Sequence, residues 1–137
     1  HDQDFTRQAA VVIISGEFRA REYPEAELAE LFSTYQQAVR GLVVFTVGSS
    51  EILYGRAGEP VRRFTPYQVK VIDSAGAGDS FRAGFIYGLL QKWGDAQIIR
   101  YAAAISAIVC ASFPGVLNSP THPEVMSFLA AQDKATI

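Results

Sequence analysis

A run of small residues at positions 74–78 leads directly into Asp79, and this stretch has the residue types best suited to chemistry. Phe81 and Phe85 follow at helical spacing, so the run predicts a loop that opens a helix. Such a loop exposes backbone N–H groups that have no intrahelical partner, and the helix dipole adds positive potential there. The sequence therefore predicts a site for a phosphate or another concentrated negative charge.

Asp79 places a carboxylate at this predicted anion site, and two roles fit the residue type. An Asp at a helix start commonly caps the helix, which contributes about 1 kcal/mol. Otherwise, a carboxylate inside an anion site is electrostatically misplaced unless it has a chemical task. The short loop alone leaves both roles open.

The longer string at residues 73–84, D-S-A-G-A-G-D-S-F-R-A-G, resembles the D-T-x-G-A-G-D-x-F-x-x-G signature of the ribokinase-like carbohydrate kinases, the PfkB family. Ser74 stands where most members have Thr, and it keeps the hydroxyl. The resemblance implies ATP-dependent phosphorylation of a sugar or sugar-like alcohol, with Asp79 as the general base. It also implies an anion hole made by the amides of Gly76, Ala77 and Gly78.

The resemblance extends to a nucleotide site. The family has T-x-G-x-x-G at the end of a strand, and this chain has Thr46 and Gly48 there, with Glu51 in place of the second Gly. A carboxylate near a triphosphate repels it, so Glu51 is a departure that bears on how the nucleotide is held. In relatives one wall of the adenine pocket corresponds to Ala103 and Ala104, for which plain core packing is an equal alternative.

The resemblance also implies metal ions. Glu17 stands where relatives carry a Glu that organises Mg²⁺, although Ile14 replaces the usual Asn of N-x-x-E, and an exposed Glu without a role is an alternative. Many relatives bind K⁺ or a similar monovalent cation beside the anion hole, mostly through neutral oxygen ligands, which suit a hard, weakly charged ion. By position, the groups of that site are those of Asp73, Ala75, Cys110, Phe113, Gly115 and Ser119.

Alternating strand and helix patterns position these residues, and they predict an α/β fold. The apolar runs at 10–14 and 42–47 predict buried strands of a mostly parallel sheet, and a helix entered at Pro24 and ended at Gly41 is expected between them. A polar turn is expected at 15–18. Strand-like pieces at 52–54, 61–64 and 68–71 predict an antiparallel meander that returns to the glycine loop.

Three helices are expected in the C-terminal half. The first runs from the glycine loop to Trp93–Gly94, the second is an interior helix capped by Asp95, and the third is a short packing helix over 123–130. Two polar features stay open. Arg82 can reach a phosphate or pair with a carboxylate, and Arg62 with Arg63 can face a phosphate or, as is commoner on an edge strand, solvent.

Composition sets the broad class. A length of 137 residues predicts one domain that buries roughly two-thirds of its unfolded surface. The net charge of −2 gives no indication of a nucleic-acid or membrane partner, and a single Cys excludes an internal disulfide. With no apolar run of about 18 residues and no leader pattern at His1, we expect a soluble, cytoplasmic chain.

Relatives are about twice as long as this chain, so residues 1–137 are expected to be the C-terminal nucleotide-binding and catalytic portion of such a kinase. A second hypothesis is a non-catalytic nucleotide-binding piece that needs the N-terminal half or a partner chain. A dinucleotide-binding domain is disfavoured because the glycine loop lacks G-x-G-x-x-G spacing. The small-molecule sugar and the oligomeric state, including a homodimer, cannot be read from these residues.

Overall fold

The computed structural model describes residues 2–135, which form two compact units, His1–Thr65 and Pro66–Ile137. Each unit has a hydrophobic core cluster of its own. The length of the chain predicts a single domain, whereas the contacts within the chain divide it at residue 65, so the two units are described one at a time.

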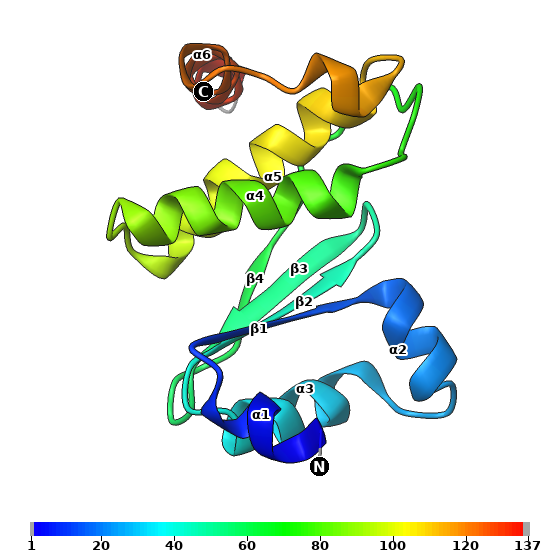
Figure 1. The fold of residues 1–137 in the computed structure, drawn as a ribbon, viewed down its shortest axis with the longest axis vertical. Coiled ribbons are helices and arrows are strands. Elements are labelled where there is room, and N and C mark those ends of the chain that lie inside the picture. The colour runs from blue at the N-terminus through cyan, green and yellow to red at the C-terminus, as the bar shows by residue number, and fades with distance from the viewer. Residues whose placement is uncertain (1, 136–137) are drawn as a thin grey trace. The chain divides into compact units, whose positions relative to one another are not determined.

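The first unit contains a four-stranded sheet in the order β1-β2-β3-β4 (Figure 1). Its strands are β1 (Val11–Ser15), β2 (Leu42–Val47), β3 (Glu51–Gly55) and β4 (Arg62–Phe64). β1 pairs with β2 in parallel, and β2–β3 and β3–β4 pair antiparallel. In this portion the expected mostly parallel sheet is therefore mixed, because short turns join the last three strands. The strand expected at 68–71 does not form.

Three helices accompany this sheet: α1 (Asp2–Gln8), α2 (Gly16–Glu22) and α3 (Leu28–Ala38). α1 was not expected, and α2 occupies the position of the expected polar turn. Ser15 explains that difference, since its hydroxyl accepts a hydrogen bond from the amide of Phe18 at 3.1 Å and caps a new helix.

The crossover helix α3 begins later than expected and ends earlier. The expectation of entry at Pro24 and termination at Gly41 is wrong, because Glu27 is the N-cap and Val39 the C-cap. The Glu27 carboxylate accepts hydrogen bonds from the amides of Ala29 and Glu30 at 3.1 and 2.9 Å. These bonds lower the pKa of Glu27.

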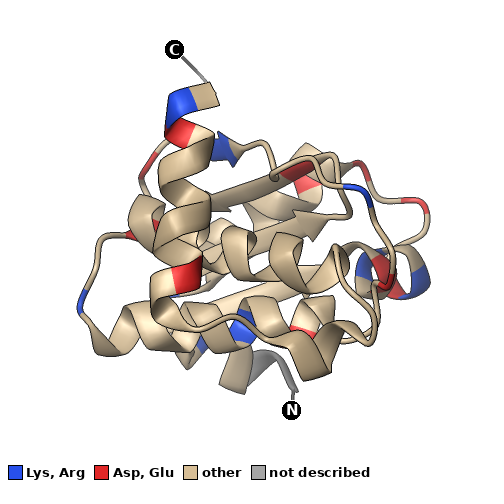
Figure 2. Cartoon of the chain, turned by 90° about the horizontal axis from the view of Figure 1, so that it is seen from above, with Lys and Arg blue, Asp and Glu red and all other residues tan. Residues whose placement is uncertain are grey.

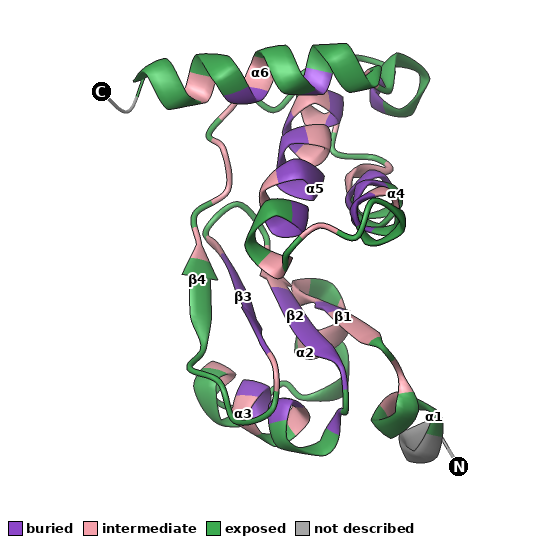
Figure 3. Ribbon diagram, turned by 90° about the vertical axis from the view of Figure 1, so that its left-hand side faces the viewer, coloured by how far each residue is buried: buried purple, intermediate pink, exposed green. Residues whose placement is uncertain are grey.

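The core of the first unit lies between α3 and the central strands. Phe32 of α3 and Phe45 of β2 are fully buried with ring centroids 5.0 Å apart in an edge-to-face arrangement. Leu53 of β3 belongs to the same cluster. Figure 3 shows the contrast between the buried strands β2 and β3 and the exposed strand β4. Burying each such side chain contributes about 1.5–3 kcal/mol, so this cluster fixes the strand register.

The second unit consists of helices α4 (Ala77–Leu90), α5 (Asp95–Cys110) and α6 (His122–Ala135), with a short 3-10 helix η1 (Gly115–Asn118). The expected helix after the glycine loop is confirmed, although it ends at Leu90 rather than at Trp93–Gly94. α4 packs closely on α5 because Gly84 lacks a side chain: a Cβ there would lie 3.1 Å from the Cα of Ala102.

The other two helices also differ slightly from expectation. Gly94 takes the N-cap position of α5, so Asp95 is its first residue and not its cap. α6 is longer than the expected 123–130. It packs on α5 through Val125 and Leu129, which contact a cluster that includes Tyr101. The hydroxyl of Tyr101 also forms a 2.8 Å hydrogen bond with Nδ1 of His122.

A reciprocal cap begins α6. The Glu124 carboxylate accepts hydrogen bonds from the amide and the hydroxyl of Thr121 at 2.6 and 3.0 Å, and the amide of Glu124 donates to the same hydroxyl at 3.4 Å. The bonds to the carboxylate lower the pKa of Glu124 below its usual value of 4.5.

This cap predicts a pH dependence of stability. Because the folded pKa of Glu124 lies below its unfolded value, the stabilisation is present above about pH 4.5 and is lost as the pH falls through the folded pKa. Glu124→Gln should therefore destabilise the chain at neutral pH, and the difference from the parent should shrink in acid. Urea unfolding followed by fluorescence of Trp93 at several pH values measures this. A difference that is constant with pH would contradict it.

Candidate functional site

The glycine loop depends on one left-handed residue. Gly76 has φ +78° and ψ 2°, a conformation that favours glycine, and it is the N-cap of α4. A Cβ at this position would lie 2.0 Å from Cγ1 of Val116. Both the backbone and the packing therefore require glycine here. As a result, α4 begins at Ala77, immediately after this bend.

Asp79 lies in the first turn of α4 and does not cap it, because the helix start has no side-chain cap hydrogen bond. Its carboxylate is 87% exposed. The capping role that the sequence left open is not the one found, and the carboxylate is available to a ligand. Its nearest charged neighbour is Arg82, whose Nη1 lies 3.3 Å from Oδ1 of Asp79.

The backbone amides of the loop divide into bonded and unbonded groups. The Ala77 amide donates to the Ser74 carbonyl at 3.2 Å, which closes a turn. Among residues 2–135, the amides of Gly76, Gly78 and Asp79 have no protein acceptor. Two of the three amides expected to form an anion hole, those of Gly76 and Gly78, are therefore unbonded. The third, that of Ala77, is engaged within the loop. The Asp79 amide is an additional donor that the sequence analysis missed.

The Asp73 carboxylate joins this loop to the segment after α5. Its Oδ1 accepts from the Ala75 amide at 3.0 Å, and its Oδ2 accepts from the Gly115 amide at 3.3 Å. Gly115 has no room for a side chain, since a Cβ there would lie 2.6 Å from the Val109 carbonyl oxygen. This carboxylate thereby holds together two segments that are 42 residues apart in the sequence.

Of the groups implied for a cation site, those of Asp73, Ala75 and Gly115 meet at this carboxylate. The other three, Cys110, Phe113 and Ser119, have different surroundings. The Cys110 carbonyl accepts from the amides of Ile72 and Asp73 at 2.8 and 3.2 Å, so both of its lone pairs are engaged. Burial and the Asp73 charge raise the pKa of the Cys110 thiol. The Ser119 hydroxyl donates to the Val116 carbonyl, and Phe113 is exposed.

Among residues 2–135 no three His, Cys, Asp or Glu side chains are grouped to hold a metal.

Ala104 belongs to the buried cluster between α5 and α6 and has no exposed surface. Ala103 is also buried. For Ala104 the structure agrees with the core-packing alternative, because its methyl group is already covered within the second unit.

In the first unit the candidate nucleotide residues lie where the parallel strands end. Thr46 pairs with Ser15 across the parallel β1–β2 pair, and Gly48, with φ +56°, begins the turn to β3. Gly16 at the start of α2 is close to both, since a Cβ there would lie 3.4 Å from the Thr46 carbonyl oxygen. The exposed Glu17 follows it in the first turn of α2. The carboxyl ends of parallel strands are the usual ligand site of such sheets.

Glu51 is compensated by a positive charge. Its Oε2 lies 2.9 Å from Nη1 of Arg63, whose side chain is mostly exposed. Glu51 pairs with Val47, so strand alternation places its side chain on the sheet face opposite that of Thr46. The repulsion expected between Glu51 and a triphosphate is therefore reduced, because the Glu51 side chain lies on the other face of the sheet from Thr46 and pairs with Arg63. Figure 2 shows charged residues of both signs spread over several elements.

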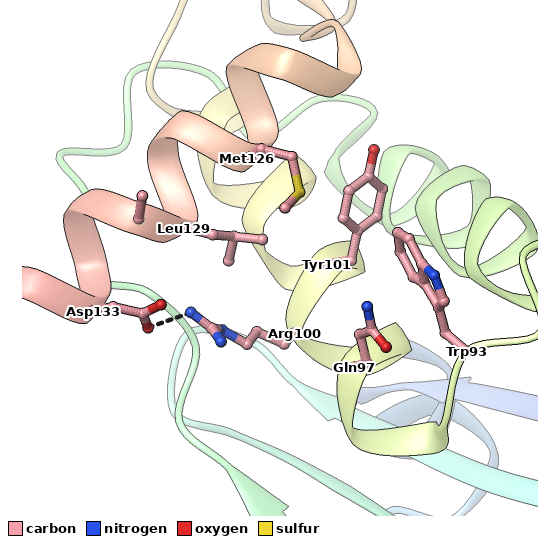
Figure 4. Close-up of a pocket in the computed structure, with 8 residues that line it drawn as sticks. Trp93, Gln97, Arg100, Tyr101, Met126, Leu129 and Asp133 are labelled. Atoms are coloured by element: carbon pink, nitrogen blue, oxygen red, sulfur yellow. Dashed lines mark hydrogen bonds and ion pairs between the residues drawn. The ribbon is translucent and has the colours of Figure 1, made fainter.

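A cavity of about 200 Å³ lies elsewhere, between α5 and α6 (Figure 4). It contains none of the expected site residues. Arg100 borders it, and its guanidinium donates to the Tyr67 hydroxyl and to the Asp133 carboxylate. These bonds raise the pKa of Arg100 and lower that of Asp133. The cavity is lined by Trp93, Gln97, Arg100, Tyr101, Met126, Leu129, Ala130 and Asp133.

The fold and this loop are those of an α/β chain with unbonded amides beside an exposed aspartate, which suits an anionic ligand, and comparison with known proteins gives the family. The sequence pattern described as "pfkB family carbohydrate kinase" matches residues 7–122. The chain therefore belongs to the pfkB family of carbohydrate kinases.

Two curated relatives illustrate the match. A protein of Dictyostelium discoideum named "Uncharacterized sugar kinase" is 39% identical over 75 residues, which are 52% of this chain and 21% of that protein. A 5-dehydro-2-deoxygluconokinase of Geobacillus thermodenitrificans is 27% identical over 113 residues, 82% of this chain and 33% of that protein. The chain thus spans a third or less of these relatives.

Solved structures show the same fold. A ribokinase from Thermotoga maritima superposes with a TM-score of 0.82 at 18% identity, covering 93% of this chain and 44% of that one. A putative ribokinase II from E. coli, in complex with ATP and Mg²⁺, gives 0.81 at 17% identity, with 94% and 42% covered. A fructokinase double mutant from Vibrio cholerae, bound to fructose, ADP and potassium, gives 0.73 at 25%, with 88% and 41% covered. The α/β, ribokinase-like fold expected from the sequence is confirmed.

In the part of the chain that the structure describes, no helix combines the length and apolar character that crossing a membrane requires.

The packing of Gly76 gives a test of the loop. Gly76→Ala should destabilise the second unit through both the left-handed backbone and the 2.0 Å approach to Val116, together about 1–3 kcal/mol. Val116→Ala in the same chain should recover part of that loss, because it removes the clash and leaves the backbone strain. A double-mutant cycle in urea measures the coupling. Strictly additive effects would contradict this packing.

Proposed function

We propose that the polypeptide carrying these residues transfers the γ-phosphoryl group of ATP to a hydroxyl of a sugar or sugar-like alcohol. The observation that carries this proposal is the combination, at the start of α4, of unbonded amides at Gly76, Gly78 and Asp79 with an exposed carboxylate on Asp79. Membership in the pfkB family supports the reaction class. The names of relatives support sugars and sugar acids as acceptors.

Each group has a role in this reaction. The Asp79 carboxylate takes the proton of the acceptor hydroxyl as the acceptor oxygen bonds to the γ-phosphorus. The bond from that phosphorus to its bridging oxygen breaks, and the electron pair leaves with ADP. The amides of Gly76 and Gly78 donate to the transferring phosphoryl oxygens, whose negative charge the N-terminus of α4 also favours. The Ala77 amide supports the loop through its bond to Ser74 and contributes less as a donor.

The nucleotide and its ions are assigned to residues by the same proposal. Thr46 and Gly48 lie beside the nucleotide, as the strand ends and the ATP complex of the E. coli neighbour support. Mg²⁺ neutralises charge on the phosphates when bound, and the exposed Glu17 carboxylate is the side chain placed to hold it or its waters. Ala103 is assigned to the adenine wall with less support, because it is buried.

A monovalent cation such as K⁺ fits beside the loop. Asp73 already connects the two segments that would hold it, and the potassium-bound Vibrio neighbour supports the ion. The main-chain oxygens of Ala75, Phe113, Gly115 and Ser119 are the proposed ligands. Cys110 is the weakest member of the set, because its carbonyl already accepts two amides.

A second candidate is a nucleotide-binding portion that turns over only with further polypeptide. It is favoured by one observation: the chain covers 44% or less of the solved kinases described above. The acceptor-binding residues would then lie outside residues 1–137. An assay of the whole polypeptide against the segment alone distinguishes the two candidates.

The test of the general base is Asp79→Asn in the whole polypeptide, assayed for ATP consumption with a panel of sugars and sugar acids. Loss of the base should lower kcat by about 10²–10⁴-fold and leave ATP binding nearly unchanged. Glu22→Gln is a matched control that removes an exposed carboxylate, also paired with an arginine, in α2. Near-normal turnover by the Asp79 variant would remove this residue from the mechanism.

A further inference from the structure

Arg82 extends back over the start of α4 toward the glycine loop. Its Nη1 lies 3.3 Å from the Asp79 carboxylate, one turn earlier in the helix. The same atom lies 3.6 Å from the position that a Cβ on Gly78 would take. Both contacts are to residues of the first turn of α4, so the guanidinium lies along the helix surface beside Gly78 and Asp79, the two helical residues whose amides are unbonded.

This ion pair contributes little to folding. The side chains of Arg82 and Asp79 are 49% and 87% exposed, and exposed pairs contribute about 0–1 kcal/mol. The remaining guanidinium N–H groups of Arg82 have no acceptor among the described residues. The side chain thus has unused donors. Its position also brings a positive charge next to the Asp79 carboxylate.

The consequence concerns the phosphate. An exposed Asp79 carboxylate beside an anion site repels an incoming triphosphate, and a guanidinium within hydrogen-bond reach offsets that charge. Arginine also matches phosphate oxygens with two parallel N–H groups, which lysine cannot do. Arg82 therefore compensates the charge of Asp79 and, with its unused donors, can engage the oxygens of the transferring phosphoryl group.

We propose that Arg82 binds the transferring phosphoryl group and exchanges its contact with Asp79 for the phosphate oxygens. This inference rests on the proposed function. Before the nucleotide binds, the guanidinium pairs with the carboxylate. Once the phosphoryl group lies on the loop amides, Arg82 donates to its oxygens, and Asp79 is released to take the acceptor proton. Bond making and breaking are those of the kinase step, and Arg82 changes only its hydrogen-bond partners.

The kinetic test compares Arg82→Gln and Arg82→Lys in the whole polypeptide. Arg82→Gln should lower kcat by about 10²–10³-fold, with a smaller change in the KM of the sugar, because the lost contact is strongest in the transition state. Arg82→Lys should recover only part of the loss, since it restores charge without the fork. Added guanidinium ion should partly rescue an Arg82→Ala variant, which a purely structural role would not allow.

A matched control is available in α2. Arg21 forms a 2.7 Å surface pair with Glu22 and is also largely exposed, so Arg21→Gln removes the same charge from a residue that has no assigned role. Its kcat should stay within about twofold of the parent, as is usual for a surface substitution. If Arg82→Gln gives the same result as this control, the role assigned to Arg82 is overturned while the kinase proposal stands.

ATP binding, measured by calorimetry, keeps the inference testable without turnover. Arg82→Gln should weaken ATP binding about tenfold relative to the Arg21→Gln control, the effect of one lost charge-assisted contact. Asp79→Asn should not weaken it, because that change removes the competing partner. Binding unaffected by Arg82→Gln would overturn the inference. Binding that depends on Arg82 in a polypeptide that never phosphorylates a sugar would support the phosphate contact and contradict the proposed function instead.

Discussion

The structure around the candidate site depends on the carboxylate of Asp73, which accepts amides from Ala75 and from Gly115. These two bonds fix the loop before α4 against the segment after α5. The left-handed Gly76 then fits against Val116, and in the first turn of α4 the amides of Gly78 and Asp79 have no acceptor among the described residues, whereas that of Ala77 donates to Ser74. The proposed anion site thus depends on a loop geometry that a buried helix start would not provide.

Arginines also compensate the charge of two carboxylates near the proposed binding residues. Each unit has one carboxylate that bears on the proposed nucleotide site, and each of these carboxylates has an arginine within 3.3 Å: Glu51 with Arg63 and Asp79 with Arg82. The pairs differ in direction, because Glu51 lies on the sheet face opposite Thr46 whereas Asp79 lies beside the unbonded amides. The first pair therefore offsets the charge of Glu51, and the second holds the carboxylate of the proposed general base next to a cation whose guanidinium matches phosphate oxygens.

The sequence predicted the elements whose signals are local and strong. The apolar run of β2 and the small-residue loop before α4 lie where expected, because burial on both faces and left-handed glycine leave clear patterns. It failed where a single side chain decides, as at the Ser15 cap, which makes a helix of an expected turn. It could not reveal the Asp73–Gly115 bond or the engaged Ala77 amide, since both depend on how distant segments or successive peptide groups meet.

Amide NMR shifts during an ATP titration measure directly whether the unbonded amides at the start of α4 bind phosphate. The amide protons of Gly76, Gly78 and Asp79 should shift strongly, because each gains a charged acceptor, while that of Ala77 should shift little. Shifts confined to the cavity between α5 and α6, around Trp93, with none in the loop, would contradict phosphate binding by these amides.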